Sequence, residues 1–464
     1  MKEKKYNLVK ALSWYTIGSV LIKSINFFTL RIFTNIINTS DFGVYGVYQS
    51  YLAIFGMIIL VGTAHSIKMV KYDEDIDYNS YVSSVIYIPI IGTICFLVIT
   101  QYVSCFISSI ADLPINMWQI LFMTAGIDSV VNIISSKLIL EGEYKIYIAS
   151  SLINSTVNVG LSIVLCYMIY SGSNAYWARI YGGLAAGFTN ALFFLFFFKP
   201  ENPRFKYIKK GVMLGLPLLV HSIGTQVLVQ SDKIVISQMC SYSEVGIYTA
   251  AVNIVVIPTT LLGSVEHSWS PWYYESLSKQ NYQEIVRKNT AIVSLFGLGI
   301  VLFMLGSPEV VRLMTSMDYW KAIYVLIPLT LAVFAELIYI IPLNLELYNK
   351  DNNAIWIYTV SAVVFNIIFD IVFIKIFGFL AGAYVTCASR FLLFLLHYYR
   401  AKKIDANGTL NLKVVVLLIV CLIITNVATV VLADYCYIRW GCILLLSIGS
   451  VVFLFMYRKC NSEV

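Results

Sequence analysis

Two cations lie inside the first long apolar segment of the sequence, where a charged side chain needs a reason. Lys23 and Arg31 are eight positions apart, so an α-helix would place them on the same half of its surface, about 12 Å apart along the axis. An ionised side chain at the centre of a membrane span costs on the order of 3 kcal/mol. Such cations usually face water or an anion, and the pair predicts part of a binding path for an anionic substrate. Structural ion pairs with other helices, or an Arg31 side chain that reaches the outer surface, are the alternative interpretation.

Two further cations lie in apolar segments of the second half of the chain. Lys233 follows Asp232 near the end of one segment, and Arg390 falls in the middle of another. Adjacent residues of a helix do not face each other, so Asp232 and Lys233 need not form a pair. We predict that Lys233 and Arg390 assist substrate binding from the second half, with interfacial anchoring as the alternative for Lys233.

Three acids are also embedded in apolar segments: Asp128, Glu336 and Asp370. Each is a candidate either to balance one of the buried cations or to carry a coupling ion, H⁺ or Na⁺. Pro217 follows Gly215 within an apolar segment, and this pair is the best candidate for a hinge because proline removes a backbone hydrogen bond.

Several chemistries are not expected. The sequence has no phosphate-binding G-x-x-x-x-G-K-[ST] loop and no cluster of His, Cys and carboxylate residues at metal-ligand spacing. None of the nine cysteines forms a C-x-x-C pair. We therefore predict no catalytic residues, no metal and no cofactor beyond the coupling ion, and a protein that is not an enzyme.

The composition places these residues in a membrane protein. The 464 residues are 59% hydrophobic and only 12% charged, whereas soluble domains carry about 25% charge. The apolar runs are continuous rather than alternating, which favours helices over a β-barrel. The predicted fold class is an all-α polytopic membrane protein. The net charge of +7 comes mainly from loops and does not indicate a nucleic-acid partner.

Apolar windows predict about fourteen transmembrane helices. They cover residues 12–37, 43–70, 80–109, 116–139, 146–170, 176–198, 211–240, 244–275, 290–313, 322–347, 354–377, 379–399, 411–433 and 436–458. With a cytoplasmic N-terminus, 23 of the 32 Lys and Arg residues fall on the cytoplasmic side and five on the outer side. This bias predicts that both termini are cytoplasmic.

A short repeat indicates that the chain consists of two related halves. Ser40-Asp41-Phe42-Gly43-Val44-Tyr45 is echoed by Ser243-Glu244-Val245-Gly246-Ile247-Tyr248, 203 positions later. We predict a first six-helix half at 1–198, a basic cytoplasmic linker at 199–210, a second six-helix half at 211–403 and two additional helices at 404–464. A pseudo-two-fold relation is expected between the halves.

The motifs in this order resemble those of Wzx-type polysaccharide flippases of the multidrug/oligosaccharidyl-lipid/polysaccharide (MOP) exporter superfamily. The residues that carry the resemblance are Asp41-Phe42-Gly43-Val44-Tyr45, Gly215-Leu216-Pro217-Leu218, the run Ser231 to Ser237, Val245-Gly246-Ile247-Tyr248, Trp269-x-Pro271, Asn366-x-x-x-Asp370 and Phe377-Gly378-x-x-Ala381-Gly382-Ala383-x-x-Thr386. The resemblance extends over the whole chain. Asp370 stands where the family often has asparagine.

The resemblance implies a central cavity that opens alternately to each side of a bacterial cytoplasmic membrane. The implied substrate is an undecaprenyl-diphosphate-linked oligosaccharide for O-antigen, capsule or another surface polysaccharide. Lys23, Arg31, Lys233 and Arg390 would then attract the diphosphate. Membrane lipids, glycosyltransferases and a polysaccharide polymerase are the implied partners.

Two alternatives remain open at the level of sequence. One is a multidrug exporter of the same superfamily, which would favour acids rather than cations in its first half. The other is a membrane glycan polymerase or glycosyltransferase, against which the short outer loops and the repeat both argue. Whether a proton gradient, a sodium gradient or the substrate gradient drives transport is also left open.

Overall fold

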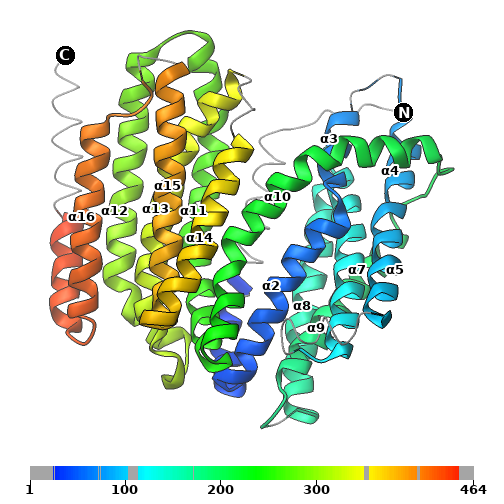
Figure 1. The fold of residues 1–464 in the computed structure, drawn as a ribbon, viewed down its shortest axis with the longest axis horizontal. Coiled ribbons are helices and arrows are strands. Elements are labelled where there is room, and N and C mark those ends of the chain that lie inside the picture. The colour runs from blue at the N-terminus through cyan, green and yellow to red at the C-terminus, as the bar shows by residue number, and fades with distance from the viewer. Residues whose placement is uncertain are drawn as a thin grey trace. The chain divides into compact units, whose positions relative to one another are not determined.

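The computed structural model describes residues 24–448 apart from 26, 72, 74, 103–112, 171, 350–354 and 405–407. Over this part of the chain the secondary structure is helical and no strand is present (Figure 1). The predicted all-α class is therefore confirmed. Ten of the described helices are long and apolar enough to cross a membrane. Since both chain ends lie outside the described residues, the total of fourteen spans stays a prediction.

The helices up to residue 278 follow the predicted spans closely. They are α2 (Thr39–Leu60), α3 (Thr63–Val70), α4 (Tyr78–Val85), α5 (Tyr87–Tyr102), α7 (Ile115–Leu140), α8 (Tyr144–Met168), α9 (Tyr176–Leu195), α10 (Phe205–Met239) and α11 (Tyr242–Ser278). The predicted spans 43–70 and 80–109 are each divided into two helices. Between α2 and α3 the residues Val61 and Gly62 adopt the left-handed conformation, whereas Ile86 between α4 and α5 keeps helical dihedral angles. The hydropathy pattern alone does not detect these breaks.

The later helices are equally regular. They are α12 (Tyr282–Met314), α13 (Ala322–Tyr348), α14 (Ile355–Phe377), α15 (Leu380–Ile404), α16 (Leu412–Val431) and a shorter apolar helix at Cys436–Ile448. Helix α12 begins eight residues before the predicted start at 290, because the Asn281 side chain caps the backbone N–H of Glu284 in a polar first turn. Hydropathy windows miss such a polar extension.

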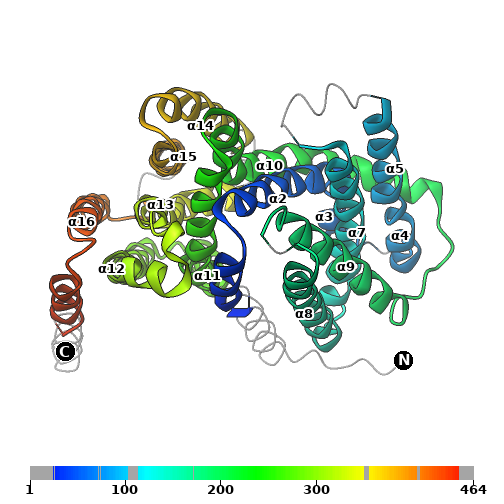
Figure 2. The ribbon, with the colours of Figure 1, turned by 90° about the horizontal axis from the view of Figure 1, so that it is seen from below.

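Contacts divide the chain into two compact units. The first comprises Met1–Thr249 with Asp370–Phe379, and the second comprises Ala250–Phe369 with Leu380–Val464. In the first unit α8 packs along α9, and α2 packs against α7 and α10 (Figure 2). In the second unit the largely buried α13 packs along α15, and α12 packs against α16. The predicted division at residues 198, 211 and 403 remains a prediction.

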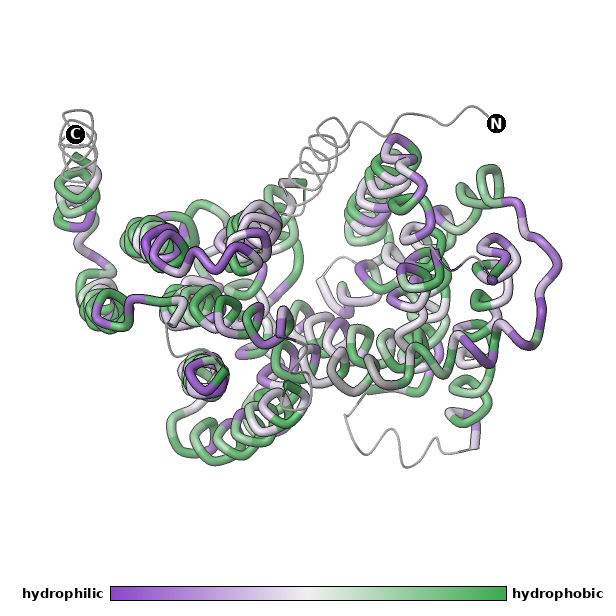
Figure 3. Tube along the Cα trace, turned by 90° about the horizontal axis from the view of Figure 1, so that it is seen from above, coloured by the Kyte–Doolittle hydropathy of each residue, from purple (hydrophilic) through white to green (hydrophobic). Residues whose placement is uncertain are grey.

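Hydrophobic and hydrophilic residues are distributed differently between the helices and the segments that connect them. Figure 3 shows hydrophobic residues along the helices and hydrophilic residues gathered in many of the connecting segments, including the segment that leads into α10. Helix α10 runs without interruption for 35 residues through Pro217 and bends along its length (Figure 1). The role of Pro217 as a hinge stays a prediction.

Both copies of the repeat begin a helix, which explains part of their shared sequence. At the start of α2 the Asn38 side chain accepts a hydrogen bond from the Asp41 backbone N–H at 2.8 Å. At the start of α11, Ser241 and Glu244 cap each other reciprocally, with Ser241 N to Glu244 Oε2 at 3.1 Å and Glu244 N to Ser241 Oγ at 3.3 Å. The repeated acid is thus the third helical position of a capping motif.

The repeated glycines bring the two copies into direct contact within the first unit. A Cβ on Gly43 would overlap the carbonyl oxygen of Tyr242, and a Cβ on Gly246 would overlap that of Thr39. Thr39 Oγ1 and Ser243 Oγ are hydrogen-bonded at 2.6 Å. Tyr242 and Thr39 are themselves 203 positions apart, so the glycine contacts are reciprocal, as a two-fold relation requires.

A buried arginine fixes the C-terminal segment to α12 in the second unit. Arg439 is fully buried and contacts both carboxylate oxygens of Glu309 at 2.5 Å. Its remaining donors reach the backbone carbonyls of Leu305, Leu432 and Ala433. All the polar capacity of the guanidinium group is used for attachment, so this cation has a structural role.

Candidate functional site: charges buried in each unit

The best-defined predicted cation is Lys233, which is 5% exposed on α10. Its Nζ donates a hydrogen bond to Gln230 Oε1 at 2.8 Å, one turn earlier on the same helix. The same amide oxygen accepts a hydrogen bond from Ser50 Oγ of α2 at 3.2 Å. Among the described residues the ammonium group forms no ion pair within 4.0 Å. Its hydrogen bond is therefore to a neutral group, while the Asp232 carboxylate of the same helix is close enough to interact with its charge.

Next to this lysine, two acids meet in the same unit. Asp232 is 2% exposed and accepts a short hydrogen bond from the Tyr248 hydroxyl of α11. Asp370 of α14 is fully buried, and its carboxyl group lies within hydrogen-bonding reach of the Asp232 carboxyl. Two buried carboxylates at this separation repel each other unless a proton or a cation lies with them. The pair is thus suited to bind a small cation.

The predicted residues of the second unit also form a cluster. Arg390 Nη1 of α15 is 3.5 Å from Glu336 Oε1 of α13, and both side chains are mostly buried. Arg390 also donates a hydrogen bond to the Tyr339 hydroxyl, one turn along α13, and Glu266 of α11 is close enough to interact with Glu336. Since the ion pair joins Arg390 to Glu336, Glu336 is placed to balance the charge of Arg390.

The other predicted residues are more scattered. Lys23 lies outside the described residues. Arg31 is described, has an exposed side chain, and its backbone carbonyl accepts hydrogen bonds from Thr34 and Asn35. Asp128 has an exposed side chain on α7, with Oδ1 3.1 Å from the position that a Cβ on Gly187 of α9 would occupy. The roles of Arg31 and Asp128 stay predictions.

Sequence reasoning missed a buried pair in the second unit. His397 Nδ1 of α15 lies 3.0 Å from Glu346 Oε1 of α13, and the two side chains are 2% and 0% exposed. The predicted helices contained both residues, but they come from different helices and no spacing in the sequence indicated that they meet. They hold the ends of α13 and α15 together.

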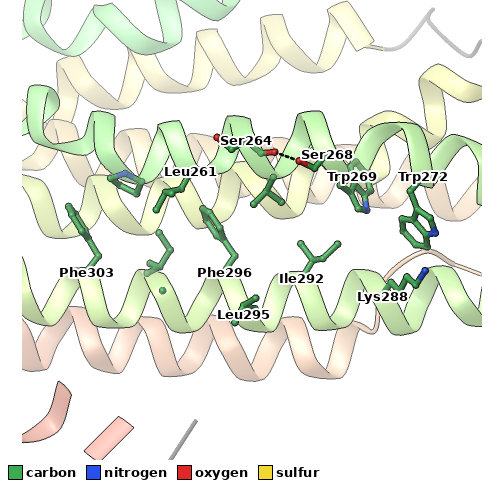
Figure 4. A pocket seen from close by; sticks show the side chains of 14 residues that line it. Leu261, Ser264, Ser268, Trp269, Trp272, Lys288, Ile292, Leu295, Phe296 and Phe303 are labelled. Carbon is green, nitrogen blue, oxygen red and sulfur yellow. Dashed lines mark hydrogen bonds between the residues drawn. The ribbon is translucent and has the colours of Figure 1, made fainter. Parts of the chain in front are cut away.

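The second unit also contains an apolar groove between α11 and α12 (Figure 4). Its volume is about 710 Å³, and Leu261, Ile292 and Phe296 are among the side chains that line it. Lys288 and Trp272 lie at one end, where Lys288 Nζ is 4.6 Å from the Trp272 ring centroid and 2.7 Å from Glu284 Oε1. Along α11 the groove extends from Pro258 to Trp272, about 21 Å at the helical rise.

The fold and the apolar helices together define a multi-pass, all-helical membrane protein. The structure is similar to lipid II flippase MurJ in an inward closed conformation, with a TM-score of 0.71 and 16% identity over 98% of this chain and 100% of that one. It is also similar to an inward-facing multidrug resistance MATE family transporter of the MOP superfamily, with a TM-score of 0.66 and 13% identity over 84% of this chain and 98% of the other. At these identities the similarity establishes the fold.

The sequence identifies the family. The family described as "Polysaccharide biosynthesis protein" matches residues 8–277, which is more than half of the chain. The chain therefore belongs to the polysaccharide biosynthesis protein family, and its fold is that of MOP-superfamily transporters. The predicted resemblance is confirmed at this level. No curated protein matches the sequence.

Proposed function

We propose that this protein is a flippase that moves undecaprenyl-diphosphate-linked oligosaccharides outward across a bacterial cytoplasmic membrane by alternating access, for the assembly of a surface polysaccharide. Both termini would be cytoplasmic, and the protein would catalyse no reaction. Glycosyltransferases that make the substrate and a polymerase that uses it are the expected partners. The assembled product would be O-antigen, capsule or another surface glycan.

The observation that carries this proposal is the buried ammonium group of Lys233. Among the described residues this lysine, which is 5% exposed, is hydrogen-bonded to an amide oxygen and forms no ion pair within 4.0 Å, although the Asp232 carboxylate interacts with its charge. A diphosphate is the part of the proposed substrate that needs such a cation within the membrane. Arg390, Arg31 and Lys23 are proposed to contribute further positive charge along the path.

The groove between α11 and α12 supports a substrate with a hydrocarbon chain. Its length of about 21 Å exceeds the roughly 15 Å of hydrocarbon in one leaflet, so a chain that starts at the Lys288 end can lie along it. The predicted orientation puts Lys288 on the cytoplasmic side, where the substrate is loaded. We propose this groove as a place for part of the polyprenyl chain or for a membrane lipid in its stead.

The experiment is translocation in proteoliposomes with a fluorescent polyprenyl-diphosphate oligosaccharide, where a membrane-impermeant quencher reports the leaflet. We expect the protein to accelerate transfer, and the Lys233→Gln variant to reduce the rate at least tenfold because it removes the charge while it keeps a hydrogen-bonding group. The matched control is Lys375→Gln, an exposed lysine of α14, which should stay within twofold of the natural protein. Export of cationic dyes without lipid transfer would favour the multidrug alternative and contradict the proposal.

Asp232 and Asp370 are proposed to hold the coupling cation, H⁺ or Na⁺, in the first unit. Replacement of Asp370 by Asn removes one charge but keeps the shape of the side chain, so cation binding should be weakened at least tenfold. We expect Asp370→Asn to make transport insensitive to an imposed ion gradient, measured in the same vesicles with proton and sodium gradients in separate runs. Asp434→Asn, at an exposed acid, is the control. A variant that still responds fully to the same gradient would exclude this pair as the coupling site.

A further inference from the structure

A small polar pocket lies in the first unit, and its α7 residues begin one helical turn after Asp128. Its volume is about 210 Å³, and its polar side chains are His65 and Lys68 of α3, Asn132 and Ser136 of α7, and Ser222 of α10. This is smaller than pockets that hold drug-sized ligands, which measure roughly 300 to 1,000 Å³. The pocket is thus of a size for a small polar group such as one or two phosphates.

The pocket is shaped by a strained break between α2 and α3. Val61 has a φ of 49° and Gly62 a φ of 65°, so two consecutive residues adopt the left-handed conformation. This conformation is unfavourable for a β-branched residue such as Val61. The break packs on α10, where a Cβ on Gly62 would be 2.5 Å from the Gly215 carbonyl oxygen. Strain of this kind persists where the surrounding structure enforces it, often at binding sites.

The break sets the direction of α3, and with it the polar residues of the pocket. His65 and Lys68 are three positions apart, so they share one face of α3, and Asn132 and Ser136 are four apart and share one face of α7. Ser222 completes the pocket from α10. Three helices therefore contribute side chains that donate hydrogen bonds, and none of the described residues that line the pocket is a carboxylate.

Lys68 differs from the other lysines of this region. Lys71 lies 4.1 Å from the Tyr78 ring, Lys137 lies 3.8 Å from a Glu141 oxygen, and Lys210 is 3.1 Å from Asp73. The hydrogen bond from Lys210 holds the pKa of the Asp73 carboxyl below its usual range. Within the described residues Lys68 forms no ion pair and no contact with an aromatic ring. Lys68 lines a pocket that also offers the His65 imidazole, an amide and two hydroxyl groups.

An exposed lysine alone needs no partner, because water solvates it. The combination with Asn132, Ser136 and Ser222 is what selects a ligand: a cation and neutral donors around a small space match the oxygens of a phosphate or diphosphate. The predicted orientation places this end of α3 on the cytoplasmic side. A lipid diphosphate that arrives from that side would meet the pocket before it reaches Lys233.

We propose that the pocket lined by Lys68, Asn132, Ser136 and Ser222 is a binding site for the diphosphate group of a lipid at the cytoplasmic face. This inference rests on the proposed function, since it names an entry site for the same substrate. The proposed entry site is separate from the charged residues within the spans.

The test is binding of farnesyl diphosphate to the purified full-length protein in detergent, with inorganic pyrophosphate and phosphatidylglycerol as separate probes. We expect Lys68→Gln to weaken farnesyl diphosphate binding about tenfold, Lys68→Arg to keep most of it, and phosphatidylglycerol to compete poorly. Lys71→Gln, three residues along and outside the pocket, is the matched control and should change binding less than twofold. An unchanged elution profile and melting temperature would show that the variants are folded.

Three results would overturn the proposal. Equal losses in Lys68→Gln and Lys71→Gln would indicate attraction to general surface charge. No loss in Lys68→Gln would exclude the pocket. Pyrophosphate that binds as tightly as farnesyl diphosphate, with the same dependence on Lys68, would assign the pocket to a soluble anion. The translocation assay separates the two proposals. If the natural protein transfers the lipid but Lys68→Gln does not change binding, only the pocket is rejected. If binding depends on Lys68 but no transfer occurs, only the flippase function is rejected.

Discussion

Replacement of Gly43 by Ala is expected to destabilise the protein by at least about 3 kcal/mol, because the added methyl group would overlap a backbone carbonyl oxygen. Overpacking usually costs about 1 to 3 kcal/mol when side chains can move aside. Here the obstacle is the carbonyl of Tyr242, which is part of the start of α11 and cannot rotate away. A larger residue such as valine should leave little folded protein. Thermal unfolding of the detergent-solubilised protein, followed by the loss of its monodisperse elution peak, measures the effect.

The second copy of the repeat provides an equivalent variant for comparison. Gly246→Ala should cost about as much as Gly43→Ala, because it meets the equivalent carbonyl of Thr39. The double variant should cost less than the sum of the two, since one separation of the helices relieves both overlaps. Gly56→Ala is the control in the same helix, with no atom within 4 Å of the new methyl group, and should be neutral or slightly stabilising. Similar melting temperatures for Gly43→Ala and Gly56→Ala would show that the helices do not cross this closely.

Replacement of Arg439 by Met is expected to cost about 3 to 5 kcal/mol, the usual result when one partner of a buried ion pair is removed. Glu309 would keep its charge beside an apolar side chain, and the carbonyls of Leu305, Leu432 and Ala433 would lose the guanidinium donor, although Ala433 also accepts from Arg312. The measurement is the melting temperature, together with the rate at which a protease cuts the segment after α16. We expect faster cleavage, because Arg439 attaches this segment to α12.

Two comparisons make that prediction specific. The double variant Arg439→Met with Glu309→Met should be more stable than Arg439→Met alone, because it leaves no unpaired charge. Asp434→Asn breaks a neighbouring pair, in which Asp434 is 84% exposed and 2.7 Å from Arg312, and should cost about 1 kcal/mol or less. If Arg439→Met were as mild as Asp434→Asn, the buried contact with Glu309 would have no special role.

The helices of this protein could be predicted well from its sequence because long apolar runs leave few alternatives. The predicted span 322–347 and the observed α13 differ by one residue. The breaks were missed, since hydropathy is insensitive to the backbone dihedral angles of Val61. The polar first turn of α12 was also missed, because its start depends on the side chain of Asn281 and not on apolar periodicity.

The candidate site was predictable in its residue types but not in its partners. Buried charge singled out Lys233, Arg390 and Asp370 correctly as residues within helices. That Arg390 meets Glu336, or that Asp370 meets Asp232, depends on how separate helices pack, which spacing along the chain does not reveal. The pocket around Lys68 could not be predicted either, because it is assembled from three helices.

The crossing of the repeated glycines has a mechanical consequence for α11. This helix runs for 37 residues, about 55 Å, and it starts at the crossing in the first unit and continues into the second. A rotation of this helix about the glycine contact at its start would therefore displace its far end in proportion to its length. A tilt of about 10° at Gly246 would carry the far end of a straight helix of this length through about 9 Å. The close approach of Gly43 and Gly246 thus fixes the start of a helix whose length would turn a small tilt there into a large displacement of its far end.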